Sequence, residues 1–141
     1  MNGTERVKLS KVIDKMQLTN LTPDVDTPGI WLHTPEVNRP ALQLTGFYNQ
    51  FDNDRIQIIG NVEYSYLSSL SETDRYERYM QLLSSNIPCL VFCRDLEPEA
   101  KVIELATKYK IPILKSKAAT SAFMAEVIRW LNVQLAPCIV I

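Results

Sequence analysis

The second half of the chain alternates short apolar runs with longer stretches of helical periodicity. Uninterrupted apolar runs of this length are typical of strands that are covered on both faces of a sheet. The uninterrupted run at 87–93 predicts such a strand, and the short runs at 55–60 and 111–116 predict two further strands. Apolar side chains three and four positions apart predict helices over 61–70, 72–86, 97–110 and 119–135. The resulting order, β-α-α-β-α-β-α, predicts a three-layer α/β/α fold with a mostly parallel sheet and right-handed β-α-β crossovers.

The apolar stripe of each predicted helix indicates its inner face, which is the side that packs against the core. The clearest helix, over 97–110, has Pro98 near its start and lysines in its last turn, as the helix macrodipole favours. Ser71 and Asp74 resemble a capping box at the start of the helix over 72–86. The predicted inner faces are Val62, Tyr66 and Leu70; Tyr76, Tyr79, Met80 and Leu83; Val102, Leu105, Ala106 and Tyr109; and Phe123, Val127, Leu131 and Leu135.

The beginning of the chain predicts a small opening unit with less regular patterning. Ser10 is in position to cap a short helix over 11–16. Short strands are predicted at 17–22 and 29–34, with Trp31 and His33 on one face of the second. The residues between these strands contain two prolines and two aspartates, which favour a turn or loop.

We expect the fold to be organised around residues 38–67. Asn38 is predicted to cap a short helix whose first turn begins at Pro40. Gly46 is predicted to end this helix in a left-handed conformation. The next strand closes at Gly60, where we expect a close approach of backbones. The apolar side chains of the short helix and the turn after it are predicted to cluster: Leu42, Leu44, Phe47 and Phe51.

Composition and charge exclude several classes of protein. The chain has 141 residues, of which 46% are hydrophobic and 22% charged, so we predict one globular domain over 1–141. The net charge of −1 gives no reason to expect a nucleic-acid partner. No apolar run approaches the roughly 20 residues that cross a bilayer, and the N-terminus lacks the apolar core of a secretory signal. We therefore expect a cytoplasmic protein with no membrane partner.

Cysteine and histidine usage argues against metal and nucleophile chemistry. Cys89 and Cys93 would point to the same face of a strand about 13 Å apart, too far for a disulfide, so we predict buried thiols rather than a redox pair. Cys138 has no neighbouring histidine or second cysteine. His33 is the only histidine, so a zinc site lacks ligands and a catalytic triad has one candidate base. Metal-binding and catalytic residues are therefore predicted to be absent, and His33 to be a strand-face residue.

Five residues are candidates for a ligand site or an interface. Asn38 and Arg39 place a helix start and a guanidinium where an anion could bind; alternatively Asn38 caps the helix and Arg39 is a structural or solvated charge. Glu63 and Tyr64 follow the end of the predicted strand at Gly60, where open α/β sheets place ligands; alternatively Glu63 complements the helix dipole. Arg55 could contact a ligand or form a surface pair with Asp52 or Asp54. Tyr76 and Tyr79 are predicted to belong to the core rather than to a stacking platform.

The sequence resembles the N-terminal domain of bacterial HPr kinase/phosphorylase. The resemblance is carried by the RPxLxLxGF pattern at 39–47 and the RIQxxGxxExxYL pattern at 55–67, and it continues through 87–114 and 120–137. It implies a three-layer α/β domain similar to the first domain of a cell-wall ligase. It also implies a hexameric parent enzyme that phosphorylates a serine of the phosphocarrier HPr, with ATP or pyrophosphate, and dephosphorylates it in carbon catabolite regulation.

The resemblance also indicates what this chain should not do. Catalysis in the family depends on a C-terminal domain with a P-loop, GxxxxGK[ST], which binds ATP with magnesium. The present sequence has no such pattern and no glycine after Gly60. We therefore expect a non-enzymatic chain without a cofactor of its own, in which residues 137–141 are a linker to an absent catalytic domain.

The sequence leaves three hypotheses for the function of this chain. The first is a regulatory, assembly or ligand-sensing domain whose partners are the catalytic domain, other subunits and, through the parent enzyme, HPr. The second is a stand-alone module that binds a nucleotide or phosphorylated metabolite near Arg39 and Glu63. The third, a small hydrolase or transferase, is the weakest, because the chain has one histidine, three separated cysteines and no glycine-rich loop.

Overall fold

The computed structural model describes residues 6–136, and its main sheet is mixed but mostly parallel. Within these residues the main sheet has five strands, in the order β2 (Thr19–Asn20), β7 (Ile113–Lys115), β6 (Leu90–Phe92), β5 (Ile56–Ile59) and β4 (Val37–Asn38). Strands β4 to β7 pair in parallel, and β2 adds to β7 as an antiparallel edge. The described helices are α1 (Leu9–Lys15), α2 (Ala41–Leu44), α3 (Asn61–Ser69), α4 (Glu72–Leu83), α5 (Ala100–Tyr109) and α6 (Thr120–Gln134).

The buried side chains of the central strands alternate between two cores, one on each face of the sheet. The first core receives Ile56, Ile58, Cys89, Val91, Cys93 and Leu114. The second core receives Ile59, Leu90, Phe92 and Ile113. This alternation has the period of two that a strand requires. It confirms that the apolar runs of the sequence are strands covered on both faces.

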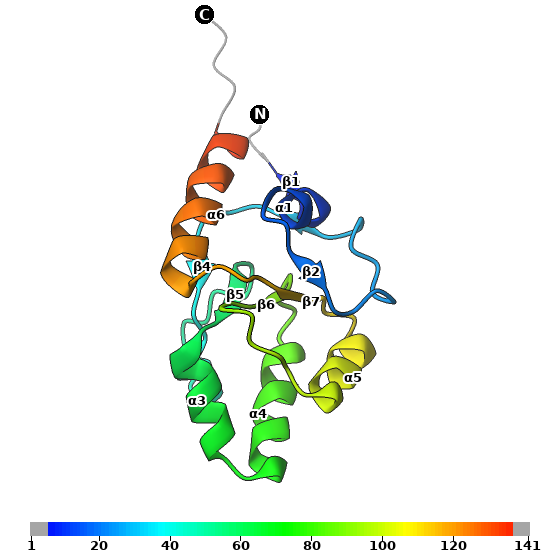
Figure 1. Cartoon of the computed structure of the whole chain (residues 1–141), viewed down its shortest axis with the longest axis vertical. Helices are drawn as coiled ribbons and strands as arrows, with labels where there is room; N and C mark the ends of the chain where they lie inside the picture. The colour runs from blue at the N-terminus through cyan, green and yellow to red at the C-terminus, as the bar shows by residue number, and fades with distance from the viewer. Residues whose placement is uncertain (1–5, 137–141) are drawn as a thin grey trace, which may run out of the picture.

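The helices form the two outer layers of the predicted three-layer α/β/α fold (Figure 1). Helices α1 and α6 cover the first core, and α3, α4 and α5 cover the second. The crossovers from β5 to β6 and from β6 to β7 pass over the same face and step the sheet in one direction, as crossovers of one hand must. The predicted fold class is therefore confirmed.

The opening unit pairs β1 (Val7–Lys8) with β3 (Trp31–Leu32) in a separate two-stranded sheet. Its helix α1 begins two residues earlier than the sequence predicts, with Lys8 as the N-cap residue and no side-chain cap. Ser10 lies inside the first turn, so its predicted capping role is wrong. The chain enters α1 directly from β1, and Val7 and Leu9 are both buried, so apolar packing places the start of this helix.

The segment from Asn38 to Gly46 differs from its prediction at the first residue. Val37 and Asn38 form β4, which pairs with Ile56 and Gln57, so Asn38 is a strand residue and not a helix cap. Helix α2 is only four residues long and has Pro40 as its N-cap residue. Gly46 has φ +100°, which confirms the left-handed stop.

The predicted inner faces are confirmed for the later helices and are partly wrong for the earlier ones. Val102 and Ala106 of α5 and Phe123, Val127 and Leu131 of α6 are buried. On α3 the buried residues are Glu63 and Leu67, whereas Val62 is 67% exposed. Leu42, Phe47 and Met80, which the sequence assigns to apolar clusters, are also exposed. Ser71 does cap α4, because its hydroxyl accepts a hydrogen bond from the Asp74 backbone at 3.2 Å.

The two described thiols are buried and free, as predicted. Burial raises the pKa of Cys89 to about 12 and that of Cys93 to about 11, from an ordinary value of 9. Both thiols therefore stay protonated and unreactive at neutral pH. Cys138 and the predicted linker at 137–141 lie outside the described residues. None of the helices within 6–136 is long and apolar enough to cross a membrane.

These buried thiols should make the fold sensitive to alkaline pH. Above pH 9 a thiol that ionises only in the unfolded chain lowers the free energy of unfolding by about 1.4 kcal/mol per pH unit. This loss of stability is absent below the pKa of the thiol in the unfolded chain. It grows with pH until the pH reaches the raised pKa of the thiol in the folded chain. Urea unfolding between about pH 8 and 11 should therefore show a shallower decline for Cys89→Ala than for the parent chain. An equally steep decline in both proteins would contradict the prediction.

Candidate functional site

A partly buried ion pair occupies the carboxyl edge of the sheet, where the sequence offers candidate ligand residues. Arg39 follows β4, and Glu63 lies in the first turn of α3. The Arg39 Nε and Nη2 atoms donate to the two Glu63 carboxylate oxygens at 3.0 and 2.7 Å. The Gly60 backbone N–H donates to Glu63 Oε1 at 2.8 Å. Glu63 is 2% exposed and Arg39 is 36% exposed, so the carboxylate is the enclosed partner.

This geometry joins two candidate residues to each other rather than leaving both open to a ligand. Glu63 completes the glutamate half of a capping box at α3 and also favours the positive end of the helix dipole. The bidentate pair is the strong form of an Arg–carboxylate contact. The arrangement matches the alternative reading, in which Glu63 caps the helix and Arg39 is its structural partner. An anion-binding role for Arg39 stays a prediction.

Gly60 is enclosed by side chains from two other elements. A Cβ atom at this position would lie 2.6 Å from Arg39 Nη2 and 2.7 Å from Thr120 Oγ1, at the start of α6. These separations are too short for real contacts, so any side chain at position 60 would have to displace Arg39 or Thr120. The close approach expected at Gly60 is therefore made by side chains and not by backbone.

Asn38 belongs to a chain of buried amides next to this ion pair. Its Nδ2 atom donates to Gln57 Oε1 at 2.7 Å and to Gln43 Oε1 at 3.3 Å. Gln57, which is fully buried in β5, donates in turn to the Arg55 carbonyl oxygen at 2.9 Å. The amide of Asn38 is thus used to join β4, β5 and α2.

Arg55 lies at the other end of β5 from Glu63, so the structure does not bring these two candidates together. Its Nη2 atom is 3.0 Å from a carboxylate oxygen of Asp52 and 3.0 Å from one of Glu36. Both acids are more than half exposed. This is the surface pair that the sequence offers as the alternative to a ligand contact.

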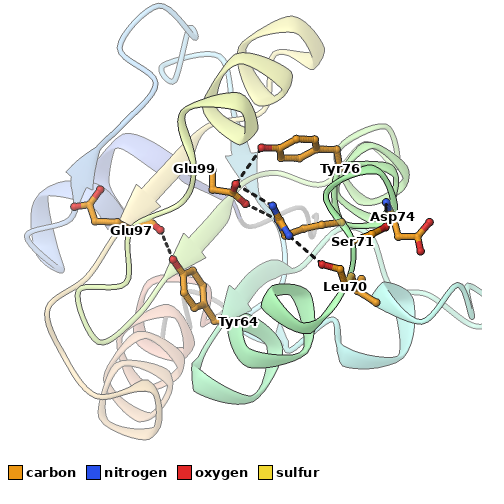
Figure 2. A network of polar contacts seen from close by, with 8 residues as sticks. Tyr64, Leu70, Ser71, Asp74, Tyr76, Glu97 and Glu99 are labelled. Carbon is orange, nitrogen blue, oxygen red and sulfur yellow. Dashed lines mark hydrogen bonds and ion pairs between the residues drawn. The ribbon is translucent and has the colours of Figure 1, made fainter.

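Tyr64 lines a cavity between α3, α4 and the start of α5. Its ring packs edge-on against Phe92, with the ring centroids 6.4 Å apart. This separation lies within the usual range of about 4.5 to 7 Å for aromatic pairs. Its hydroxyl donates to the Glu97 carbonyl oxygen at 2.6 Å, as Figure 2 shows. The cavity has a volume of about 270 Å³ and is lined by Tyr64, Leu67, Ser68, Arg75, Tyr79 and Glu99.

An ion pair between Arg75 and Glu99 forms the polar wall of this cavity. The Arg75 Nε and Nη2 atoms donate to the two Glu99 oxygens at 2.5 and 3.1 Å, and Nη1 donates to the Leu70 carbonyl oxygen at 3.1 Å. The Tyr76 hydroxyl donates to Glu99 Oε2 at 3.0 Å, and Figure 2 shows these two side chains pointing at one another. Arg75 lowers the pKa of Glu99, and the Tyr76 hydrogen bond adds to the shift.

Tyr79 supplies a second polar group to the same cavity. The residue is 3% exposed, which confirms its predicted place in the core. Burial raises its pKa above the ordinary value, with smaller contributions from Tyr64 and Glu99, which are other walls of the cavity. Its hydroxyl makes no hydrogen bond to another described residue.

Sequence reasoning identified Tyr64 but not Arg75 or Glu99. The two charges are 24 positions apart and lie on different helices, so no periodicity connects them. The acids near Pro98 suggest only the start of a helix. His33 lines a different, shallow hollow at the amino ends of the strands, together with Asp54. Within residues 6–136 no group of three or more His, Cys, Asp or Glu side chains is arranged to hold a metal ion.

Replacing Glu63 should destabilise the fold far more than replacing an exposed acid of the same type. Glu63→Gln leaves Arg39 without its enclosed counter-charge, and we expect a loss of about 2 kcal/mol in the free energy of unfolding. The loss is not larger because water still solvates Arg39 in part. Glu126→Gln, in the exposed pair with Arg129, should change it by less than about 0.5 kcal/mol. Urea denaturation monitored by circular dichroism measures both. Equal losses in the two variants would contradict a structural role for the Arg39–Glu63 pair.

Comparison with known proteins identifies the family of this chain. Residues 7–131 match the family described as "HPr Serine kinase N terminus". The chain is 48% identical over 131 residues to an HPr kinase/phosphorylase of Lachnoclostridium phytofermentans, a match that covers 93% of this chain and 42% of that protein. It is 33% identical to the HPr kinase/phosphorylase of Clostridium acetobutylicum over 94% of this chain and 43% of that protein. The chain therefore spans less than half the length of these relatives.

A solved structure supports the fold at lower sequence similarity. It contains the CBS and DRTGG domains of the regulatory region of Clostridium perfringens pyrophosphatase, complexed with the activator diadenosine tetraphosphate. The TM-score is 0.58 at 19% identity, and the match covers 92% of this chain and 47% of that one. At this identity the likeness concerns the fold alone. From the family match and the relatives together, the chain belongs to the family of HPr serine kinase N-terminal domains.

Proposed function

We propose that this chain is the non-catalytic N-terminal unit of an HPr kinase/phosphorylase and that it regulates or helps to assemble the enzyme. The parent would phosphorylate and dephosphorylate a serine of HPr in the cytoplasm, with ATP and Mg²⁺ bound in its remaining part. The observation that carries this proposal is the match itself, which covers 93% of this chain but only 42% of the relative.

The geometry of the carboxyl edge supports a role other than catalysis. In open α/β sheets this edge is the usual place for a ligand. Here it is taken up by the bonds among Arg39, Glu63 and Gly60. The polar groups at the edge therefore hold β4, β5 and α3 together instead of facing a substrate.

Four exposed apolar side chains on neighbouring elements, called the apolar face below, support a role in assembly. Leu42, Phe47, Val62 and Met80 are between 39% and 67% exposed. They lie on or next to α2, α3 and α4, and α2 contacts both other helices. Exposed apolar side chains that gather on one face are typical of protein–protein contacts. We assign this face to the remainder of the parent enzyme, because the relatives extend well beyond the matched segment.

Removing this unit from the parent enzyme should change regulation or assembly. We expect the enzyme without residues 1–136 to differ from the full-length enzyme in the rate of HPr serine phosphorylation or in molar mass, measured by light scattering. The purified 141-residue chain should transfer no phosphate from ATP to HPr. Unchanged activity and molar mass, or phosphate transfer by the chain alone, would overturn the proposal.

The apolar face can be tested separately with a matched control. In the full-length parent, Leu42→Ser combined with Phe47→Ser should shift the enzyme towards smaller species, because each change removes about 2 kcal/mol of apolar burial at a contact. Val133→Ser is the control, because Val133 is about as exposed as Leu42, at 63% against 61%, but lies on α6 and not on the apolar face. The same molar mass for the double variant and the control would exclude this face as the contact.

A second candidate function is favoured by the cavity beside Tyr64. In this alternative the chain is a stand-alone module that binds a nucleotide or phosphorylated metabolite. A cavity with aromatic walls and a few polar groups is the usual form of a small-ligand site. A screen of nucleotides and sugar phosphates by thermal shift tests it, because a ligand that binds the folded chain raises its melting temperature by mass action.

A further inference from the structure

The cavity between α3, α4 and α5 has features of a binding site for a small ligand. Its walls come from Tyr64, Leu67 and Ser68 on α3, Arg75 and Tyr79 on α4, and Glu99 at the N-cap of α5. Its volume of about 270 Å³ is close to the lower limit, about 300 Å³, of typical ligand pockets. A ligand in this space would therefore be a small metabolite rather than a macromolecule.

Arg75 is held in place independently of its acidic partner. Its Nη1 atom donates to the Leu70 carbonyl oxygen, and its guanidinium lies 5.3 Å from the centroid of the Tyr76 ring. Its side chain is 16% exposed. Arg75 thus presents Nε and Nη2 in a fixed direction, towards the position that the Glu99 carboxylate now fills.

Glu99 is the less enclosed partner of this pair. Its side chain is 43% exposed, and as the N-cap residue of α5 it makes no side-chain cap hydrogen bond. A rotation about its side-chain bonds would return the carboxylate to water without unfolding a helix turn. The pair therefore combines a cation that is fixed in place with a carboxylate that can move away from it into water.

Tyr79 places a further hydroxyl group at the wall of the cavity. It is 3% exposed, it lines the cavity, and its hydroxyl has no hydrogen-bond partner among residues 6–136. The hydroxyl is therefore free to bond to a ligand in the cavity. The Tyr64 hydroxyl already donates to Glu97, so it can only accept a hydrogen bond from a ligand.

We propose that this cavity binds a small organic anion whose carboxylate or phosphate replaces Glu99 on Arg75. Two oxygens of either group match the fork of Nε and Nη2, as the Glu99 oxygens do now. The Tyr79 hydroxyl donates to the ligand, and its organic part lies against Tyr64 and Leu67. Glu99 then competes with the ligand for Arg75, and this competition lowers the affinity of the cavity for the ligand. This site is distinct from the Arg39–Glu63 edge and does not depend on the proposed role in a kinase.

The test uses the purified chain, simple probes and one pair of matched variants. The probes are benzoate, phenyl phosphate and inorganic phosphate, with benzamide as the neutral control, and binding is followed by amide NMR shifts. Glu99→Gln removes the competing charge and should tighten binding of benzoate or phenyl phosphate about tenfold. Glu126→Gln removes an acid from the exposed pair with Arg129 on α6 and should leave binding as in the parent chain.

Two further variants separate the contribution of the Arg75 guanidinium to binding from that of the Tyr79 hydroxyl. Arg75→Lys keeps the charge but loses the two-pronged contact, so it should abolish saturable binding in the Glu99→Gln background. Tyr79→Phe should weaken binding about fivefold, by the loss of one hydrogen bond. Circular dichroism checks that each variant is folded, and the Glu99→Gln comparison remains decisive if Arg75→Lys is not.

Each outcome decides the proposal. Tighter binding of benzoate in Glu99→Gln assigns a carboxylate ligand, and tighter binding of phenyl phosphate assigns a phosphate ligand. The proposal is overturned if neither anion binds Glu99→Gln, if Glu126→Gln has the same effect, or if benzamide binds as well as benzoate. Binding of inorganic phosphate that is equal in all variants would show an adventitious ion only, and would also overturn it.

Discussion

The enclosed carboxylate of Glu63 constrains the carboxyl edge of the sheet and the elements that meet there. A charge that is 2% exposed must be matched, and here the matching groups are the Arg39 guanidinium and the Gly60 backbone N–H. Meeting that requirement fixes the end of β4 against the start of α3. It also leaves no room for a side chain at position 60, because Arg39 and Thr120 both pack over that glycine. A single acid thus closes the edge of the sheet that other α/β proteins leave open.

Two bidentate ion pairs within residues 6–136, Arg39–Glu63 and Arg75–Glu99, are alike in chemistry and opposite in exposure. In the first, the acid Glu63 is enclosed and the cation Arg39 is 36% exposed. In the second, the cation Arg75 is 16% exposed and the acid Glu99 is 43% exposed. An incoming anion can replace only an acid that is free to leave. This difference in burial makes the first pair a structural tie and the second a candidate site, although the bond patterns are the same.

Much of the fold could be predicted, because burial on both faces of the sheet leaves a strong pattern. The apolar runs around Ile58, Val91 and Leu114 mark the central strands without ambiguity. Strand β4 has only two residues, and Asn38 there reads equally well as a helix cap, so pairing with β5 decides its state. On α3 the prediction is wrong for Val62 and misses Glu63, because the exposed residue is apolar and the buried one is polar, whereas Tyr66 and Leu70 do pack against the second core. The contact between Arg75 and Glu99 joins separate crossovers, and no local signal encodes it.

The layer of α3, α4 and α5 carries both features that bear on function. The cavity lies between these helices, and the exposed side chains of Val62 and Met80 lie on α3 and α4. The opposite layer, by contrast, covers a core with the buried thiols of Cys89 and Cys93. A ligand that shifted α3 relative to α4 would therefore change the same surface that we propose as the contact with a partner. By thermodynamic linkage, a partner that preferred one packing would change ligand affinity by an equal factor. Sharing two helices is the physical route by which a small anion could regulate a larger assembly.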